Sequence, residues 1–144
     1  MLDKENHLNL RLGDEVIVHY MTFFDHSYNM KRGVMINSEM MWPISFDDVF
    51  AVVRDGELHP VGEFVFGEVV KKKVLQSSFL IIPDGVGEEV VENKAIITKP
   101  SPQNKLGLAA GDEVILMRYA NYELKHEGKS CLRFRESEVI ALCK

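Results

Sequence analysis

Three pairs of adjacent acidic residues are the side chains of this sequence best suited by type to acid–base catalysis. They are Asp14-Glu15, Asp47-Asp48 and Glu88-Glu89. Each pair adjoins an apolar run typical of a β-strand, and neighbouring residues of a strand point to opposite faces. Two carboxylates that share a proton must lie close together. We therefore interpret these acids as turn and surface residues.

The histidines and cysteines form no metal-binding pattern. The two cysteines, Cys131 and Cys143, are far apart in sequence, whereas zinc ligands come in closely spaced pairs. Neither Ser101 nor Cys131 lies in a nucleophile motif such as Gly-x-Ser-x-Gly, and there is no glycine-rich phosphate loop. The histidines are equally scattered: His7, His19, His26, His59 and His126. The sequence therefore predicts no enzyme, no metal site and no cofactor.

A basic cluster near the C-terminus could instead bind single-stranded nucleic acid. Tyr119 and Tyr122 would supply stacking surfaces for bases. Acidic residues interrupt the cluster, however, and the chain carries a net charge of -5, so a solvated hairpin face is the preferred interpretation. Nucleic acid is not the expected partner, and a small nucleic-acid-binding barrel is kept as a third hypothesis. The basic residues are Lys125, His126, Lys129, Arg133 and Arg135.

Two apolar groups remain as candidate protein-binding surfaces. The first is the continuous run Phe79, Leu80, Ile81 and Ile82, which is either a contact segment or one more buried strand. The second is a group of methionines beside the single tryptophan, Trp42. Methionine adapts to irregular binding surfaces, but we expect most of this group to be core. Its members are Met21, Met30, Met35, Met40 and Met41.

The elements that must position these residues are short strands. The chain has 144 residues, of which 46% are hydrophobic, which is enough for a packed core. Helical periodicity is scarce, and short runs rich in β-branched and aromatic residues alternate with turns, so the predicted fold class is all-β. No apolar stretch approaches the length needed to span a membrane. The two distant cysteines suit a reducing cytoplasm.

Local turn chemistry fixes several of these strands. Asp55-Gly56 predicts a two-residue hairpin turn, and Gly128 predicts another. Gly67, inside an apolar run, predicts a bulge or kink. Residues 37–41 are expected to form a loop.

The pentapeptide Gly13-Asp14-Glu15-Val16-Ile17 recurs unchanged as Gly111-Asp112-Glu113-Val114-Ile115. Gly and Asp favour a tight turn, and the apolar residues that follow favour a strand. A weaker match follows in the same order, between residues 48–53 and residues 138–143. Two matches in one order predict a structural unit that is used twice.

Residues 59–144 resemble the GroES-type co-chaperonins of the chaperonin-10 family. The resemblance rests on the opening strand with Pro60, the apolar run that ends at Pro83, the turn at Gly111-Asp112, and the closing strand at residues 138–143. It implies a GroES-like small partial barrel at residues 59–144. Residues 10–58 resemble the second half of the same unit, so a related half-repeat makes up an N-terminal domain at residues 1–58.

The resemblance also implies a function. A co-chaperonin caps a ring chaperonin of the GroEL class through an apolar loop, which here is Phe79, Leu80, Ile81 and Ile82. Family rings close where the first strand of one subunit pairs with the last strand of its neighbour, so a cytoplasmic homo-oligomer is expected. The alternative is a structural or adaptor protein that reuses the fold for assembly, for example in a phage particle. The expected oligomer interface comprises Val61, Phe64, Val65, Val139, Ile140 and Leu142.

Overall fold

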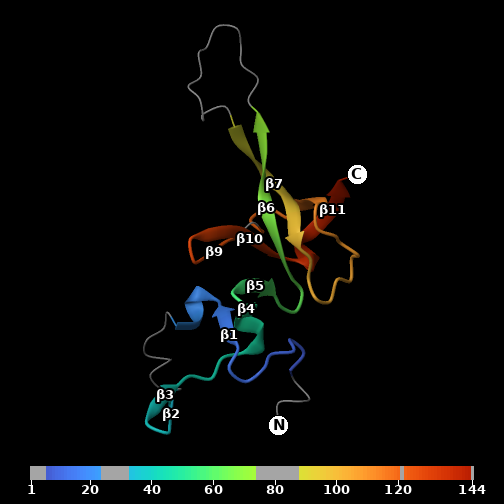
Figure 1. Ribbon diagram of the computed structural model, residues 1–144. Coiled ribbons are helices and arrows are strands. Elements are labelled where there is room, and N and C mark those ends of the chain that lie inside the picture. The colour runs from blue at the N-terminus through green and yellow to red at the C-terminus, as the bar shows by residue number, and fades with distance from the viewer. Residues whose placement is uncertain (1–5, 24–32, 74–87, 121, 144) are drawn as a thin grey trace. The chain divides into compact units, whose positions relative to one another are not determined.

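The computed structural model describes residues 6–23, 33–73, 88–120 and 122–143. The chain divides into two compact units, Met1–Gly62 and Glu63–Lys144, and each is described by itself. Almost all regular structure in both units is β-strand, and the helices are short 3-10 turns, so the predicted all-β class is confirmed (Figure 1). No helix among the described residues is both long and apolar enough to cross a membrane.

The first unit contains a three-stranded antiparallel sheet and a separate hairpin. The sheet has the order β1-β4-β5, with β4 in the centre. Its small core joins Val49, Val52 and Val61, against which Leu8, Leu10, Val16 and Val18 pack. The elements are β1 (Glu15–Val18), η1 (Tyr20–Phe23), β2 (Val34–Ile36), β3 (Glu39–Met41), η2 (Phe46–Asp48), β4 (Val49–Arg54) and β5 (Glu57–Pro60).

The second unit is one six-stranded sheet with the order β11-β8-β7-β6-β10-β9. Its longest strands, β6 and β7, pair as a ribbon that extends away from the rest of the unit (Figure 1). The elements are β6 (Phe64–Lys73), β7 (Glu88–Lys99), β8 (Glu113–Leu116), β9 (Tyr122–His126), β10 (Lys129–Arg135), η3 (Glu136–Glu138) and β11 (Val139–Cys143).

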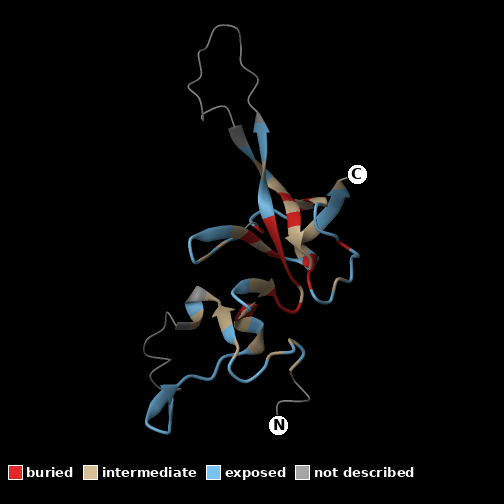
Figure 2. Ribbon diagram, viewed as in Figure 1, coloured by how far each residue is buried: buried red, intermediate tan, exposed pale blue. Residues whose placement is uncertain are grey.

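Alternation along the strands builds the core of the second unit. On β10, Leu132 and Phe134 are buried, while the arginines between and after them are not, as the two-residue period of a strand requires. Strand β8 alternates in the same way. The buried cluster, red in Figure 2, contains Val65, Ala95, Ile97, Leu108, Val114, Leu116, Ala120, Leu132 and Phe134.

The hairpin predictions hold where glycine marks the turn. Asp55 and Gly56 both have positive φ, 53° and 73°, and join β4 to β5. Glu127 and Gly128 do the same between β9 and β10. The backbone register of β6 shifts next to Gly67, which confirms the predicted bulge.

The expectation of a loop at residues 37–41 holds for residues 37 and 38 and is wrong for residues 39–41. Asn37 and Ser38, with φ of 51° and 68°, form a two-residue turn, and β3 begins directly after it. Asn occupies the left-handed region more readily than most residues, so this turn needs no glycine. Residues 39–41 are therefore the returning strand of the β2–β3 hairpin.

The two Gly-Asp turns have matching geometry. Gly13 and Gly111 have φ of 86° and 95°, a region that favours glycine. The carboxylate of Asp14 accepts a hydrogen bond from the backbone N–H three residues earlier, at 2.8 Å. Asp112 accepts the equivalent bond at the same distance. In both units this turn leads directly into a strand.

Candidate partner-binding surfaces

The ribbon of β6 and β7 is buried at its base and exposed further out. Val65 and Ala95 are fully buried, whereas Val69 and Val90 are 38% and 49% exposed. The base is packed into the core of the unit, and the outer part is held mainly by the pairing of its two strands. Segments outside the core of this kind are available to bind other proteins.

Gly67 allows the two strands to approach closely at the base of the ribbon. A Cβ at this position would lie 2.8 Å from the backbone oxygen of Ile96 and 3.1 Å from a ring carbon of Phe134. Neither contact can relax freely, because one atom is backbone and the other belongs to a buried ring. Only glycine fits here without a shift of the structure.

Charged residues stand opposite one another along the outer ribbon. The register places Lys72 opposite Glu89 and Lys73 opposite Glu88. The ribbon leads into and out of residues 74–87. The predicted contact residues Phe79, Leu80, Ile81 and Ile82 lie there, outside the described residues, so their role stays a prediction.

The residues expected at an oligomer interface fall into two groups. Val61, Phe64 and Val65 are buried, at 3%, 5% and 0% exposure. Ile140 and Leu142 lie on β11, at one end of the six-stranded sheet, and are 64% and 40% exposed. The third β11 residue, Val139, is half-buried against the core. Their assignment to an interface stays a prediction.

The basic cluster makes contacts within its own unit. The guanidinium of Arg133 lies 4.8 Å from the ring centroid of Tyr122 and 5.5 Å from that of Phe64. Burial lowers its pKa. Arg135 lies over the same phenylalanine ring and 3.6 Å from Glu63. Of the two rings proposed for stacking, Tyr122 is therefore in contact with Arg133, and Tyr119 has the guanidinium of Arg118 5.1 Å from its centroid.

The expectation that the methionine group is core is wrong for its described members. Exposure decides the question, because core side chains are almost fully covered. Met30 lies outside the described residues. The exposed fractions are 50% for Met21, 59% for Met35, 46% for Met40, 43% for Met41 and 43% for Trp42.

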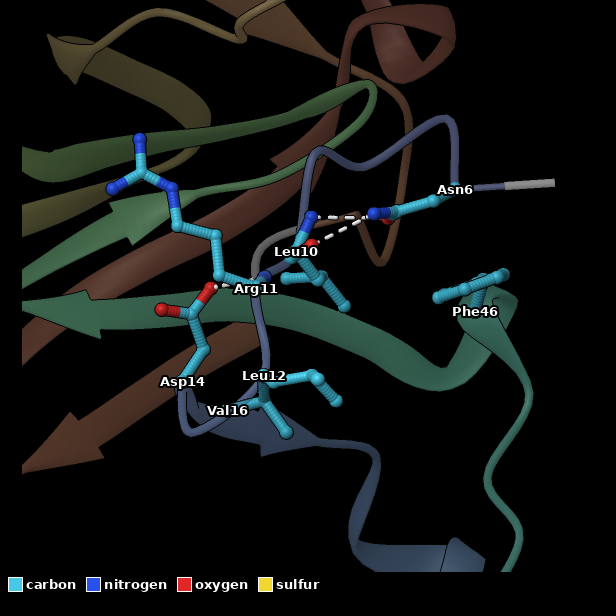
Figure 3. A pocket seen from close by; sticks show the side chains of 7 residues that line it. All are labelled: Asn6, Leu10, Arg11, Leu12, Asp14, Val16 and Phe46. Carbon is cyan, nitrogen blue, oxygen red and sulfur yellow. Dashed lines mark hydrogen bonds between the residues drawn. The ribbon is translucent and has the colours of Figure 1, made fainter. Parts of the chain in front are cut away.

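A hollow of about 230 Å³ opens beside β1 in the first unit (Figure 3). Its lining is mainly apolar. No sequence motif pointed to this hollow, although the repeated pentapeptide supplies one wall. The residues around it are Asn6, Leu10, Arg11, Leu12, Asp14, Val16 and Phe46.

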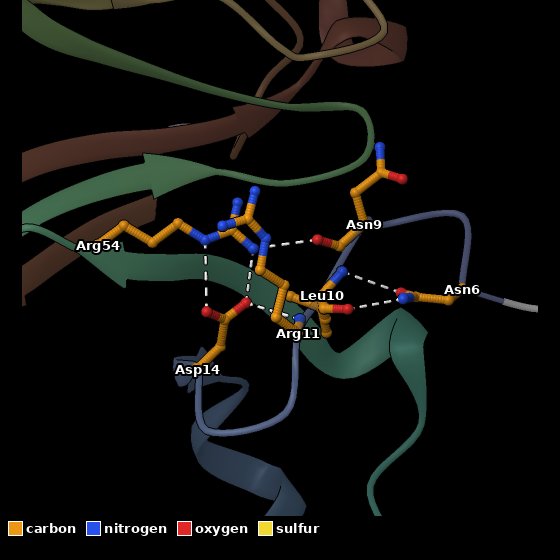
Figure 4. Close-up of polar contacts among 6 residues, drawn as sticks. All are labelled: Asn6, Asn9, Leu10, Arg11, Asp14 and Arg54. Atoms are coloured by element: carbon orange, nitrogen blue, oxygen red, sulfur yellow. Dashed lines mark hydrogen bonds and ion pairs between the residues drawn. The ribbon is translucent and has the colours of Figure 1, made fainter. Parts of the chain in front are cut away.

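A polar cluster fixes the chain next to this hollow (Figure 4). Arg54 donates to both carboxylate oxygens of Asp14, and its Nη2 also donates to the backbone oxygen of Asn9 at 3.0 Å. The hydrogen bonds from Arg54 and from the Arg11 backbone lower the pKa of Asp14. No group of three or more His, Cys, Asp or Glu side chains is placed to hold a metal ion anywhere in the described ranges. The hydrogen bonds of Arg54 join the end of β4 to the first Gly-Asp turn and to the chain before it.

Comparison with known proteins gives a family match that covers β5 and nearly all of the second unit. The family described as the chaperonin 10 Kd subunit matches residues 57–143. The chain belongs to the chaperonin 10 family. The co-chaperonin GroES of Bacillus cytotoxicus is 33% identical over 91 residues, which cover 59% of this chain and 97% of the relative. The co-chaperonin GroES of Bacillus pumilus is 31% identical over the same length and coverage. The chaperonin 10 match confirms the resemblance stated from sequence.

Proposed function

We propose that this protein caps a ring chaperonin of the GroEL class and binds it through the apolar segment Phe79–Ile82. The observation that supports this proposal is the family match over residues 57–143, which includes the whole ribbon and the segment between its strands. The relatives it resembles are named co-chaperonins. The protein then acts by binding and not by catalysis, and we place it in the cytoplasm.

The energetics of such an interaction favour an oligomer. Each large apolar side chain that enters a groove on the chaperonin contributes about 1.5–3 kcal/mol. Ordering the segment offsets much of that in any one subunit. Several linked copies recover the affinity, because every contact after the first is intramolecular.

The exposed edge of β11 is the surface we assign to the contact between copies. In the first unit, β4 pairs with β5 in antiparallel register, Ala51 opposite Pro60 and Val52 opposite His59. Strand β4 matches β11 in sequence. The two also match in pairing, because β4 pairs with β1 and β11 pairs with β8, the strands that follow the two Gly-Asp turns. We therefore expect β11 to accept a strand in the register that β5 adopts on β4.

A pull-down with a GroEL-class ring and nucleotide tests the proposed function. The unmodified protein should be retained on the ring, and Leu80→Asp should abolish retention, because a carboxylate in an apolar groove is costly. Leu106→Asp is the matched control, since Leu106 is 54% exposed on a connection far in sequence from the segment. Retention of Leu80→Asp at the level of the control would refute binding through this segment.

A further inference from the structure

The two units contain the same substructure before and within their Gly-Asp turns. In the second unit, the side-chain amide of Asn104 donates to Leu108 O and its Oδ1 accepts from Leu108 N, at 3.0 and 2.8 Å. In the first unit, Asn6 makes the same two bonds with Leu10, at 2.7 and 3.0 Å. Equivalent turns are therefore built by equivalent residues.

The strands that follow also pair in the same register. Val16 lies opposite Val52 in the first unit, and Val114 lies opposite Leu142 in the second. Each pair of strands has one register shift, just before its last residue pair. A 3-10 turn precedes the second strand in both cases, η2 before β4 and η3 before β11.

The hairpins complete the correspondence. Met35 lies opposite Met40 across a two-residue turn, as Lys125 lies opposite Ser130. Counting forward from Met40 and from Ser130 places Trp42 at the position of Leu132. In the same count Ile44 takes the position of Phe134.

Two strands of the second unit have no counterpart among the described residues of the first. Strand β6 pairs with β10 at residues 132–135, and β7 pairs with β8 on the side away from β11. Strand β1, which matches β8, has only β4 beside it in the described part of the chain, and so forms the end of its sheet. Its free edge carries backbone groups that can pair with another strand.

The exposure of the matched residues shows what these strands cover. Leu132 and Phe134 lie on β10, which pairs with β6, and are 7% and 1% exposed. Their counterparts Trp42 and Ile44 are 43% and 37% exposed. Large apolar side chains exposed together commonly mark a surface that another protein covers.

The hollow described above lies beside β1, the strand that lacks a second neighbour. Val16 lines it, and the matched residue Val114 is fully buried opposite Ala95 of β7 (Figure 3). A strand added to β1 in the manner of β7 would therefore direct a small side chain towards this hollow. The hollow and the free edge are separate observations that indicate the same position.

We propose that the first unit binds a β-hairpin of a partner protein, built like β6 and β7, with one strand on the free edge of β1 and the other on residues 42–45. The two binding surfaces are the Glu15–Val18 edge and the exposed side chains of Trp42 and Ile44. This is pairing by strand addition, in which backbone bonds supply affinity and side chains supply selectivity.

The second unit specifies the chemistry of the partner strand. On β7, Lys94 lies opposite Ile115 and bonds Glu113 at 2.8 Å, Ala95 lies opposite Val114, and Ile96 follows. Because the pentapeptide is identical, β1 offers the same edge with Glu15 in place of Glu113. The partner strand therefore carries a basic residue, then a small one, then β-branched residues.

A synthetic hairpin tests this proposal on the full-length chain. The peptide joins residues 64–70 to residues 94–99 through Asn-Gly, a two-residue hairpin turn. Binding should saturate below about 1 mM peptide and shift the emission of Trp42, the only tryptophan, to shorter wavelength. Glu15→Lys should weaken binding about 3- to 10-fold, as expected for like charges at an exposed pair.

A variant of the second pentapeptide tests whether the peptide binds specifically to the edge of β1. Glu113→Lys changes the identical pentapeptide where β7 already covers it, so the affinity for the peptide should not change. A peptide with Glu in place of Lys94 should restore binding to Glu15→Lys. The absence of saturable binding would refute the proposal, as would equal weakening by both variants. An emission shift on concentrating the protein alone would show that a second copy covers this surface, which also overturns it.

Discussion

Arg54 Nη2 lies 2.5 Å from Asp14 Oδ2 and joins the end of β4 to the first Gly-Asp turn across 40 positions of the sequence. The ion pair fixes the turn from which β1 starts. Because the hydrogen bond from Arg54 is the main cause of the lowered pKa of Asp14, the pair also makes the stability of the first unit depend on pH.

Arg54→Ala should destabilise the first unit and reduce this pH dependence, because the weaker hydrogen bond from the Arg11 backbone would still lower the pKa of Asp14. Asp14 has a folded pKa below its usual 3.8, so its contribution is fully present above that value. The contribution is lost as the pH falls through the folded pKa. Hydrogen exchange of the β1 and β4 amides at neutral and acidic pH measures it. Lys129→Ala in the second unit is the control. An unchanged acid response in Arg54→Ala would contradict the assignment.

Gly67→Ala should destabilise the second unit by about 1–3 kcal/mol, the usual cost of overpacking. The added methyl would meet the Ile96 backbone oxygen at 2.8 Å. Urea denaturation measures the free energy of unfolding. Gly33→Ala is a matched control, because the one contact of its Cβ shorter than 3 Å would be with the flexible sulfur end of Met40. Equal costs for the two variants would show that the approach of β6 to β7 is not tight.

Sequence reasoning succeeded where the chemistry is local. The turn at Asp55-Gly56 and the bulge at Gly67 follow from the residues at those positions alone. It failed for Trp42 and its neighbouring methionines, because burial depends on whether another strand lies above them. The repeated pentapeptide was a usable signal for the site on β1. The second copy of the pentapeptide forms β8, which has a strand on each side. The first copy forms β1, which has only β4 beside it among the described residues.

Phe134→Ala and Ile44→Ala should differ sharply in cost, although the two residues hold matching positions. Phe134 is 1% exposed, and its removal leaves a cavity that costs about 3–5 kcal/mol. Ile44 is 37% exposed, so truncation should cost at most about 1 kcal/mol. Thermal unfolding of each variant checks this. A large cost at Ile44 would mean that a covering strand is present in the isolated protein.

Leu142→Asp should reduce the size of the proposed oligomer, as measured by light scattering. Leu142 is 40% exposed on β11, at the end of its sheet, where an added strand would cover it. A carboxylate there would lose hydration on assembly without gaining a partner, and that cost is repeated in every subunit of a closed ring. Leu106→Asp adds the same charge away from the edge and should leave the size unchanged. If the unmodified protein is a monomer at concentrations that support chaperonin binding, the β11 contact is wrong and the assembly or adaptor hypothesis gains support.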